Sequence, residues 1–210
     1  MLCTLIGMGQ GVSLGVARRF SREGFAIAML ARDTGKLAGI DVANSRAFAA
    51  DASDESSLRT AMETVEREMG PAEVLVYNAS AGHSGRVSQL RAEDMVADYR
   101  ANVVGPAIAA QMVLPQMRKA GRGTILFTGG GLALDPYPEY ASLAAGKAGI
   151  RNLTMSLAKE CEPEGIHVAT VTICGFVQEG THFSPDQIAE EYWRLYQQPR
   201  EQWERESIYR

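Results

Sequence analysis

The sequence predicts a doubly wound α/β fold, a single domain in which helices cover both faces of a parallel sheet. Apolar runs of five to seven residues alternate along the chain with longer segments whose apolar residues recur every three or four positions. The short runs are typical of buried strands, and the longer segments are typical of the crossover helices that parallel neighbours require. With 210 residues, 46% of them hydrophobic, the chain is long enough for one well-buried core.

Six of the apolar runs are interpreted as strands. They are CTLIG (3–7), FAIAML (25–30), RAFAA (46–50), EVLVY (73–77), TILFT (124–128) and HVATVTI (167–173). Four intervening segments begin with small or acidic residues and carry helical periodicity, so we expect a helix in each. They span 11–24, 54–70, 92–121 and 139–165.

The pattern changes after the sixth run. We expect a loop there, then an amphipathic helix from Pro185 to Gln197 and a short edge strand at 207–209. Residues 1–210 would form one domain, with this helix, at about 184–197, as a short substrate lobe. Its apolar side chains either face the core or cap an apolar substrate; they are Ile188, Tyr192, Trp193 and Tyr196.

Charge and cysteine content narrow the partners. The formal net charge of −4 leaves no basic stripe for a nucleic-acid backbone, so a small-molecule ligand is favoured. Cys3, Cys161 and Cys174 lack the spacing of a metal site or a disulfide framework, which favours a reducing cytoplasm and no bound metal. The N-terminal apolar run breaks into glycines after six residues, a pattern that predicts neither a signal peptide nor a membrane span.

A glycine-rich loop, GMGQGVSLG (7–15), follows the first predicted strand and opens the first predicted helix. Glycines let the backbone approach a pyrophosphate, and the N-terminus of the helix supplies free N–H groups and the positive end of a dipole. The loop therefore predicts a dinucleotide site. A purely structural strand-to-helix turn is the alternative.

The end of the second strand bears on which dinucleotide is bound. Arg32 follows this strand, where an arginine can pair with the 2′-phosphate of NADP, whereas an acidic residue would bond the ribose hydroxyl of NAD. NADP is favoured over NAD on this ground. Arg32 could instead be a solvated loop residue, and Asp33 beside it would soften the preference.

Several motifs occur in the order and at about the spacing seen in one enzyme family. They are GMGQGVS (7–13), ARRF (17–20), FAADASD (48–54), LVYNASAG (75–82), RANVVG (100–105), GKAGIRNLTMSLAKE (146–160) and VTICGFV (171–177). The ordered set resembles the short-chain dehydrogenases/reductases over nearly the whole chain. The resemblance implies a Rossmann-type NAD(P) fold with strand order 3-2-1-4-5-6-7. It also implies dimers or tetramers packed through two long helices, here at about 92–119 and 140–161.

The same resemblance assigns the adenine half of a cofactor site. The phosphate loop would comprise Gly7, Gly9, Gln10, Gly11, Val12 and Ser13. Ser13 stands where the family usually has a third glycine. Asp51 and Ala52 resemble the pair that meets adenine, and Asn78, Ala79 and Ser80 resemble the Asn-Ala-Gly turn after the fourth strand.

The nicotinamide half matches the family less well. Cys174 and Gly175 stand where Pro-Gly is usual, Val177 follows them, and Glu179 falls where a threonine is common. Lys147, from the GKAGI motif, would bond the nicotinamide ribose.

The family typically uses four catalytic residues: a tyrosine as general acid/base, a lysine four residues later, a serine before them, and an asparagine in the preceding long helix. Lys147 and Asn102 match the lysine and the asparagine. The tyrosine position falls on Leu143, and the serine position, thirteen residues earlier, falls on Gly130. The two retained residues have roles outside direct proton donation, so the usual proton donor is missing.

Tyr140 is the candidate replacement for this acid. In a regular helix, Tyr140 and Lys147 would share a face but lie two turns, or about 10 Å, apart. A loop or bulge before Leu143, favoured by the prolines of DPYPEY (135–140), would restore the reach. A pocket-wall or packing tyrosine is the alternative.

Other polar groups are expected near the nicotinamide: His83, Thr128, Tyr137, Cys174 and His182. His83 is the strongest of these, because imidazole titrates near neutral pH and a loop at the carboxyl edge of the sheet is where ligands bind in such folds. A solvated surface histidine is the alternative.

Three functions remain open from the sequence. The first is an NADP-dependent oxidoreductase of a small carbonyl or alcohol, with a non-standard proton donor. The second is a catalytically impaired NADP-binding pseudoenzyme that acts as a sensor or structural partner. The third is reduction of an activated double bond, where hydride delivery matters more than carbonyl polarisation.

Overall fold

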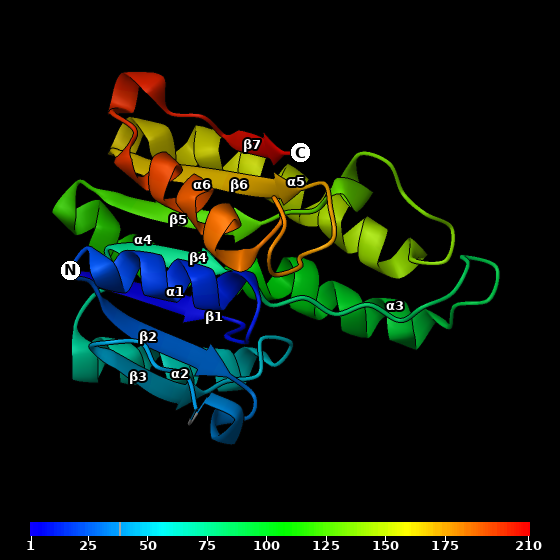
Figure 1. Ribbon diagram of the computed structural model, residues 1–210, viewed down its shortest axis with the longest axis horizontal. Coiled ribbons are helices and arrows are strands. Elements are labelled where there is room, and N and C mark those ends of the chain that lie inside the picture. Colours follow the sequence, from blue (N-terminus) through cyan, green and yellow to red (C-terminus); the bar gives the residue numbers. More distant parts are fainter. Residues whose placement is uncertain (38) are drawn as a thin grey trace.

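Seven parallel strands form the sheet at the centre of the fold (Figure 1), in the order β3-β2-β1-β4-β5-β6-β7. The structure is a computed structural model that describes residues 1–37 and 39–210. The strands are β1 (Leu2–Ile6), β2 (Ala26–Ala31), β3 (Ser45–Ala49), β4 (Val74–Tyr77), β5 (Gly123–Thr128), β6 (Ile166–Ile173) and β7 (Glu206–Tyr209). The predicted doubly wound fold, its strand order and the short edge strand are confirmed.

Helices cover both faces of the sheet. They are α1 (Val12–Arg22), α2 (Glu55–Met69), α3 (Ala92–Tyr99), α4 (Gly105–Ala120), α5 (Ala141–Cys161) and α6 (Pro185–Gln197). Short 3₁₀ turns occur at Thr34–Leu37, Gly131–Ala133, Glu162–Glu164 and Arg200–Gln202. No helix in these described ranges is long and apolar enough to cross a membrane.

The two faces of the sheet bury separate apolar layers. Successive residues of β1 alternate between them: Leu2 and Ile6 pack with α2, α4 and α5, whereas Cys3 and Leu5 pack with α1 and α6. Because both faces are covered, strand residues are apolar at consecutive positions rather than at alternate ones. This burial explains why the strands could be recognised as short apolar runs.

The helix predicted over 92–121 is not continuous. It divides into α3 and α4 around a π-helical turn at Arg100–Val104, which contains Asn102. A π-helical turn inserts one extra residue into a helix and often occurs at a functional site. Gly121, in the left-handed region with φ of 63°, ends α4.

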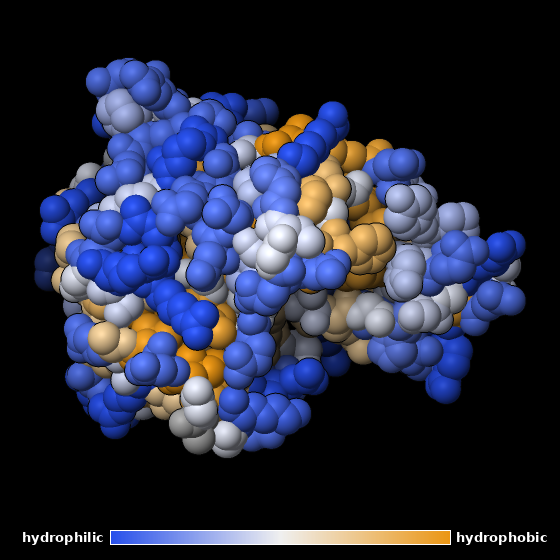
Figure 2. Space-filling view, viewed as in Figure 1, coloured by the Kyte–Doolittle hydropathy of each residue, from blue (hydrophilic) through white to orange (hydrophobic). Residues whose placement is uncertain are grey.

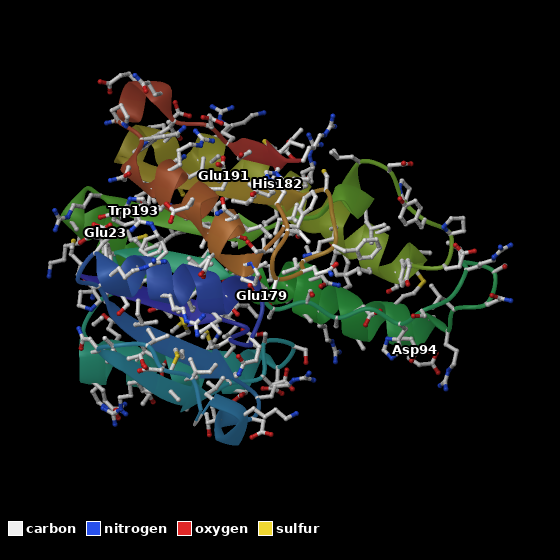
Figure 3. All side chains as sticks on the ribbon, in the orientation of Figure 1. Glu23, Asp94, Glu179, His182, Glu191 and Trp193 are labelled. Atoms are coloured by element: carbon white, nitrogen blue, oxygen red, sulfur yellow. The ribbon has the colours of Figure 1, made fainter. Side chains whose placement is uncertain are left out.

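The helices α1 and α6 pack closely against each other. A Cβ on Gly15 of α1 would lie 2.3 Å from the carbonyl oxygen of Pro185, so only glycine permits this approach. Phe20, Phe25, Trp193 and Tyr196 form an aromatic cluster beside this contact. Figure 3 shows Trp193 on the side of α6 near α1. The aromatic residues of α6 therefore belong to the core.

Replacing Phe20 by alanine should lower the free energy of unfolding by about 3–5 kcal/mol, because the substitution deletes a fully buried ring and leaves a cavity. Urea denaturation followed by circular dichroism measures the change. Phe176→Ala is the matched control: its ring is 89% exposed, and its loss should change stability by under about 0.5 kcal/mol. Equal effects in the two variants would contradict a core role for the cluster.

Candidate functional site

The glycine loop between β1 and α1 lies at the carboxyl edge of the sheet. Gly7 has φ of 84°, and a Cβ there would lie 2.3 Å from the backbone nitrogen of Ala79. The Asn78 side-chain amide donates a hydrogen bond of 3.2 Å to the Gly7 carbonyl. Gly7 therefore allows the loop to pack directly on the turn that follows β4.

Ser13 stabilises the same loop from within α1. The backbone N–H of Gly9 donates to its hydroxyl oxygen at 3.0 Å, and the hydroxyl donates to the Gly9 carbonyl at 3.3 Å. The side chain is buried. The departure from a third glycine is thus accommodated by hydrogen bonds that fix the loop. Gly9 and Gly11 border open space, because a Cβ on either would meet no atom of the described residues within 4 Å. They lie beside the N-terminus of α1, which has no side-chain cap among those residues.

A cleft of about 480 Å³, here called the N-terminal cleft, lies beside this loop. Its walls come from the segments that follow β1, β2, β3 and β4, and from α3 and the π-helical turn. It is lined by the predicted residues Gly7, Arg32, Asp51, Ala52, Asn78, Ala79 and Ser80, together with His83. The first seven were predicted to bind the adenine half of a dinucleotide, and the fold brings them together.

Arg32 and Asp51 are charged residues of opposite sign in the lining of the N-terminal cleft. Asp51 accepts hydrogen bonds from the backbone N–H and the hydroxyl of Ser53, at 2.9 and 2.6 Å. These hydrogen bonds, and the charge of Arg32, hold the pKa of the Asp51 carboxyl below its ordinary value. Arg32 itself is exposed at the end of β2.

A second cleft of about 640 Å³, here called the C-terminal cleft, lies between the β5–α5 segment, the start of the β6–α6 loop and the end of β7. Its lining includes Gly130, Tyr137, Tyr140, Leu143, Lys147 and Cys174. Figure 2 shows apolar surface beside the C-terminal end of β7 and the β5–α5 segment. Leu143 of this cleft lies close to the N-terminal cleft, because a Cβ on Gly82, between Ala81 and His83 of that lining, would lie 2.9 Å from the Leu143 Cβ.

Lys147 lies half-buried on α5 in the wall of the C-terminal cleft. Its ammonium nitrogen donates a hydrogen bond of 2.8 Å to the carbonyl of Thr128, at the end of β5. Burial lowers the pKa of Lys147 to about 8. The amine can therefore exist in both protonation states near neutral pH.

Asn102 occupies the π-helical turn and is buried. Its side-chain amide donates to the Ala81 carbonyl at 2.7 Å, and its side-chain oxygen accepts from the Ala81 N–H at 3.0 Å. A Cβ on Gly146, the residue before Lys147, would lie 2.5 Å from the Asn102 amide nitrogen. Asn102 thus links the segment after β4 to α5.

A pairing of Tyr140 with Lys147 would need a loop or bulge before Leu143, and α5 has none there. The α-helix α5 is continuous from Ala141, with Tyr140 at its N-cap, so the side chains lie about two turns apart. The structure records no hydrogen bond between them within the ranges that it describes. Tyr140 is 47% exposed, and its backbone pairs with that of Gly85.

The positions of the two missing hydroxyls flank Lys147. Leu143 lies one turn before it on α5. Gly130 has an extended backbone, and a Cβ there would lie 3.5 Å from the Cδ and Cε atoms of Lys147. That distance is ordinary van der Waals contact, so a serine at this position fits beside the lysine.

His83 lies in the N-terminal cleft and belongs to a hydrogen-bond network that the sequence did not predict. Asp98, 1% exposed, accepts from the His83 backbone N–H at 2.7 Å, lies 2.9 Å from its Nδ1, and accepts from the Ser142 hydroxyl at 2.6 Å. Burial opposes ionisation of Asp98, but these hydrogen bonds outweigh it and hold its pKa below the ordinary value. No motif could reveal a network that spans three distant elements.

The remaining candidates are dispersed. The hydroxyls of Thr128 and Tyr192 lie 2.7 Å apart in a hydrogen bond on the α6 side of the sheet. His182 stacks on Tyr209, with ring centroids 4.6 Å apart, and lies beside the end of β7 (Figure 3). Gly175 lines the C-terminal cleft. Gly9, Gln10, Gly11, Val12, Ser13, Val177 and Glu179 lie outside both linings, within the described residues.

Fold and clefts define a Rossmann-like α/β protein. The sequence profile of the short chain dehydrogenase family matches residues 2–189, and the chain therefore belongs to the short-chain dehydrogenase/reductase family.

Curated relatives support this assignment. The chain is 29% identical to an oxidoreductase of Sarocladium schorii over 83% of this chain and 72% of the relative. It is 27% identical to the 3-oxoacyl-acyl-carrier-protein reductase of Homo sapiens, with coverages of 84% and 75%. It is also 31% identical to the inactive 2-(S)-hydroxypropyl-CoM dehydrogenase 2 of Xanthobacter autotrophicus, with coverages of 74% and 69%.

Solved structures share the fold over nearly the whole chain. A metagenomic short-chain oxidoreductase in complex with NADP superposes with a TM-score of 0.90 at 24% identity, covering 99% of this chain and 96% of the other. A short-chain dehydrogenase from Rhodopseudomonas palustris gives a TM-score of 0.87 at 26% identity, with coverages of 100% and 97%.

Two substitutions in the glycine loop should separate folding from ligand binding. Gly7→Ala should lower the free energy of unfolding by more than about 2 kcal/mol, because it combines a left-handed φ with a clash against Ala79. Gly11→Ala should stay folded, since its Cβ meets no atom, yet bind NADPH at least about tenfold more weakly by crowding the pyrophosphate. Thermal melts and fluorescence titration measure the two effects. A Gly11→Ala variant with native affinity would contradict a phosphate-binding loop.

Proposed function

We propose that this protein is an NADP-dependent oxidoreductase of a small carbonyl or alcohol substrate. The observation that carries the proposal is the pair of clefts at the carboxyl edge of the sheet. One cleft is lined by Gly7, at the start of the glycine loop, and by Arg32, and the other is lined by Lys147. Gly82, which lies between Ala81 and His83 of the first cleft, packs against Leu143 of the second, so an extended dinucleotide can have its adenine end in one cleft and its nicotinamide end in the other.

The residues present fit such a cofactor. The backbone of Gly7, Gly9 and Gly11, with the N-terminus of α1, would hold the pyrophosphate. Asp51, Ala52 and the Asn78–Ser80 turn would contact the adenine nucleoside, and Lys147 would bond the nicotinamide ribose. Gly175 and Val177 would border the nicotinamide. When bound, the cofactor supplies or accepts a hydride.

A preference for NADP over NAD rests on Arg32. The neighbouring Asp33 accepts a hydrogen bond of 3.0 Å from the Gly35 N–H and lies outside the lining of the N-terminal cleft. Its carboxylate is therefore engaged with its own loop, which leaves Arg32 as the charged group at the end of β2. Two structures of similar fold, the metagenomic enzyme and an alcohol dehydrogenase from Thermococcus sibiricus, are complexes with NADP and 5-hydroxy-NADP.

Arg32→Ala should weaken NADPH binding by about 10–100-fold, because one charged hydrogen-bonding partner of the 2′-phosphate is lost. Its effect on NADH binding should stay within about threefold. Fluorescence titration of both cofactors measures the ratio. As a matched control, Arg22→Ala removes an exposed arginine of α1 outside both clefts and should change neither affinity. An equal loss for NADH and NADPH in Arg32→Ala would contradict the preference.

We also propose that this protein lies in the cytoplasm and associates with further copies of itself. The helices α3 and α5, with the π-helical turn between α3 and α4, would form the interface. Val96 and Tyr99 on α3, and Val104 on the π-helical turn, are between 40% and 52% exposed. Neighbouring large apolar side chains with this exposure support burial against a second copy.

A catalytically impaired pseudoenzyme is the second candidate. Gly130 and Leu143 leave the C-terminal cleft without the two hydroxyls that the family usually places at the substrate oxygen, and one relative of this chain is an inactive dehydrogenase. Such a protein would bind NADP without turnover and act as a sensor or a structural partner.

The double variant Gly130→Ser plus Leu143→Tyr should distinguish these functions. Serine fits beside Lys147, and the tyrosine would place a phenol one turn before it, so carbonyl reduction should rise by at least about tenfold. NADPH oxidation on a panel of ketones and aldehydes measures the rate. Turnover by both proteins supports the oxidoreductase, turnover by the double variant alone supports the pseudoenzyme, and failure of wild type to bind NADPH contradicts both.

A further inference from the structure

Lys147 is the ionisable residue of α5 that lines the C-terminal cleft. Among the described residues, its ammonium forms no hydrogen bond with another side chain. Its ammonium has three N–H groups, and the structure gives it one acceptor among the described residues, the carbonyl of Thr128 at 2.8 Å. Two N–H groups are therefore available to a ligand. A carboxylate in a structural ion pair with Lys147 would occupy these N–H groups, but the described residues supply none.

The substitutions that remove the usual hydroxyls also open space around this amine. Gly130 has no side chain beside Lys147, where a Cβ would lie 3.5 Å from its Cδ and Cε atoms. Leu143, one turn earlier, has no polar atom that could stand between the amine and a substrate oxygen. A carbonyl bound in this cleft thus has Lys147 as its nearest cationic proton source on α5.

Other titratable groups reach the same cleft from neighbouring elements. Asp135, Tyr137 and Tyr140 come from the β5–α5 segment, Cys174 from the β6–α6 loop, and Arg210 from the end of β7. None of them forms a hydrogen bond or ion pair with Lys147 in the part of the chain that the structure describes. The lysine is therefore not locked by a carboxylate, and a proton can leave it without breaking such a pair.

We propose that Lys147 is itself the general acid–base catalyst of this cleft, acting on the substrate oxygen directly or through one water. This role rests on the proposed oxidoreductase function and adds to the ribose contact assigned to the same residue. It would replace the tyrosine that the family uses, rather than assist it.

The proton transfer balances with hydride transfer. In reduction, the carbonyl carbon accepts the hydride that a bound reduced nicotinamide supplies, the C=O π bond breaks, and the oxygen takes a proton from the Lys147 ammonium. One N–H bond of Lys147 and one C–H bond of the reduced nicotinamide break while one C–H and one O–H bond form on the substrate, so the carbonyl carbon is reduced by two electrons and the nicotinamide is oxidised by two. The neutral amine then regains a proton from water.

The acid–base state of Lys147 gives opposite pH dependences for the two directions. Burial lowers the pKa of this ammonium to about 8. Reduction needs the protonated amine, so its rate should fall as the pH rises through about 8. Oxidation of the alcohol needs the neutral amine, so its rate should rise over the same interval.

Lys147→Arg is the most informative variant, because a guanidinium keeps the positive charge toward the ribose but does not release a proton at these pH values. It should bind NADPH within about fivefold of wild type and reduce the panel substrate about 10²–10⁴-fold more slowly. Lys159→Arg, an exposed lysine farther along α5, is the matched control and should leave both quantities unchanged.

A direct titration supplies a readout that does not depend on turnover. The chain has four lysines, so ¹³Cε-lysine labelling gives few NMR signals, and the Lys147 signal is the one lost in Lys147→Arg. Its midpoint in the protein without cofactor should lie at about 8. The pH profiles of wild-type reduction and oxidation should change on either side of a similar value.

Three results would overturn the catalytic role of Lys147 alone: native rates in Lys147→Arg, parallel pH profiles for reduction and oxidation, or loss of the pH-dependent limb in Tyr140→Phe with Lys147 intact. Where Lys147→Arg binds NADPH more weakly, the rate is compared at saturating NADPH, and a native rate there shows a ribose contact without proton transfer. Absence of NADPH binding or of any turnover in wild type contradicts the proposed function itself, and the catalytic role with it.

Discussion

The hydrogen bonds between Asn102 and the backbone of Ala81 hold the candidate site together. They fix the segment after β4, which lines the N-terminal cleft, to the turn at which α3 passes into α4. Gly146 lets α5 approach the same amide, so the next residue, Lys147, is positioned relative to both clefts. The π-helical turn at Arg100–Val104 places the Asn102 side chain at this junction, where it serves the fold whether or not it also binds a water.

Asp98 makes a second connection near the start of α5. Its buried carboxylate accepts hydrogen bonds from Ser142 on α5 and from His83 on the loop after β4. A buried carboxylate is stable only when its oxygens have such partners, so this network has a defined geometry. Together, Asp98 and Asn102 fix the first two turns of α5, including the positions of Leu143 and Lys147. The position of Lys147 therefore depends on polar contacts from residues that lie far from it in the sequence.

The fold was predictable from the sequence because both faces of the sheet are covered. Burial on two sides makes each strand a short apolar run. In the crossover helices between the strands, apolar residues recur every three or four positions. The gathering of Arg32, Asp51 and Asn78 in one cleft was also predictable, because each lies within two residues of the end of a strand and parallel strands bring their carboxyl ends to one edge. The network of Asp98, His83 and Ser142 was not, since its members lie 15 and 44 residues apart along the chain. Nor did apolar periodicity reveal the π-helical turn, which leaves the burial pattern on either side intact.

The predicted absence of two catalytic hydroxyls, at Gly130 and Leu143, would have a limited energetic cost. General acid catalysis contributes about 10²–10⁴-fold to a rate, whereas holding two reactants in a productive geometry lowers a barrier by about 7–11 kcal/mol. The residues that would hold the adenine half of a dinucleotide include the lining of the N-terminal cleft, which contains neither Gly130 nor Leu143. A half-buried amine with its pKa at about 8 can supply part of the general acid catalysis, because an acid whose pKa lies near the working pH is both protonated and able to release its proton. Loss of the tyrosine is thus compatible with a slow reductase. It requires a pseudoenzyme only if Lys147 cannot exchange its proton with the substrate.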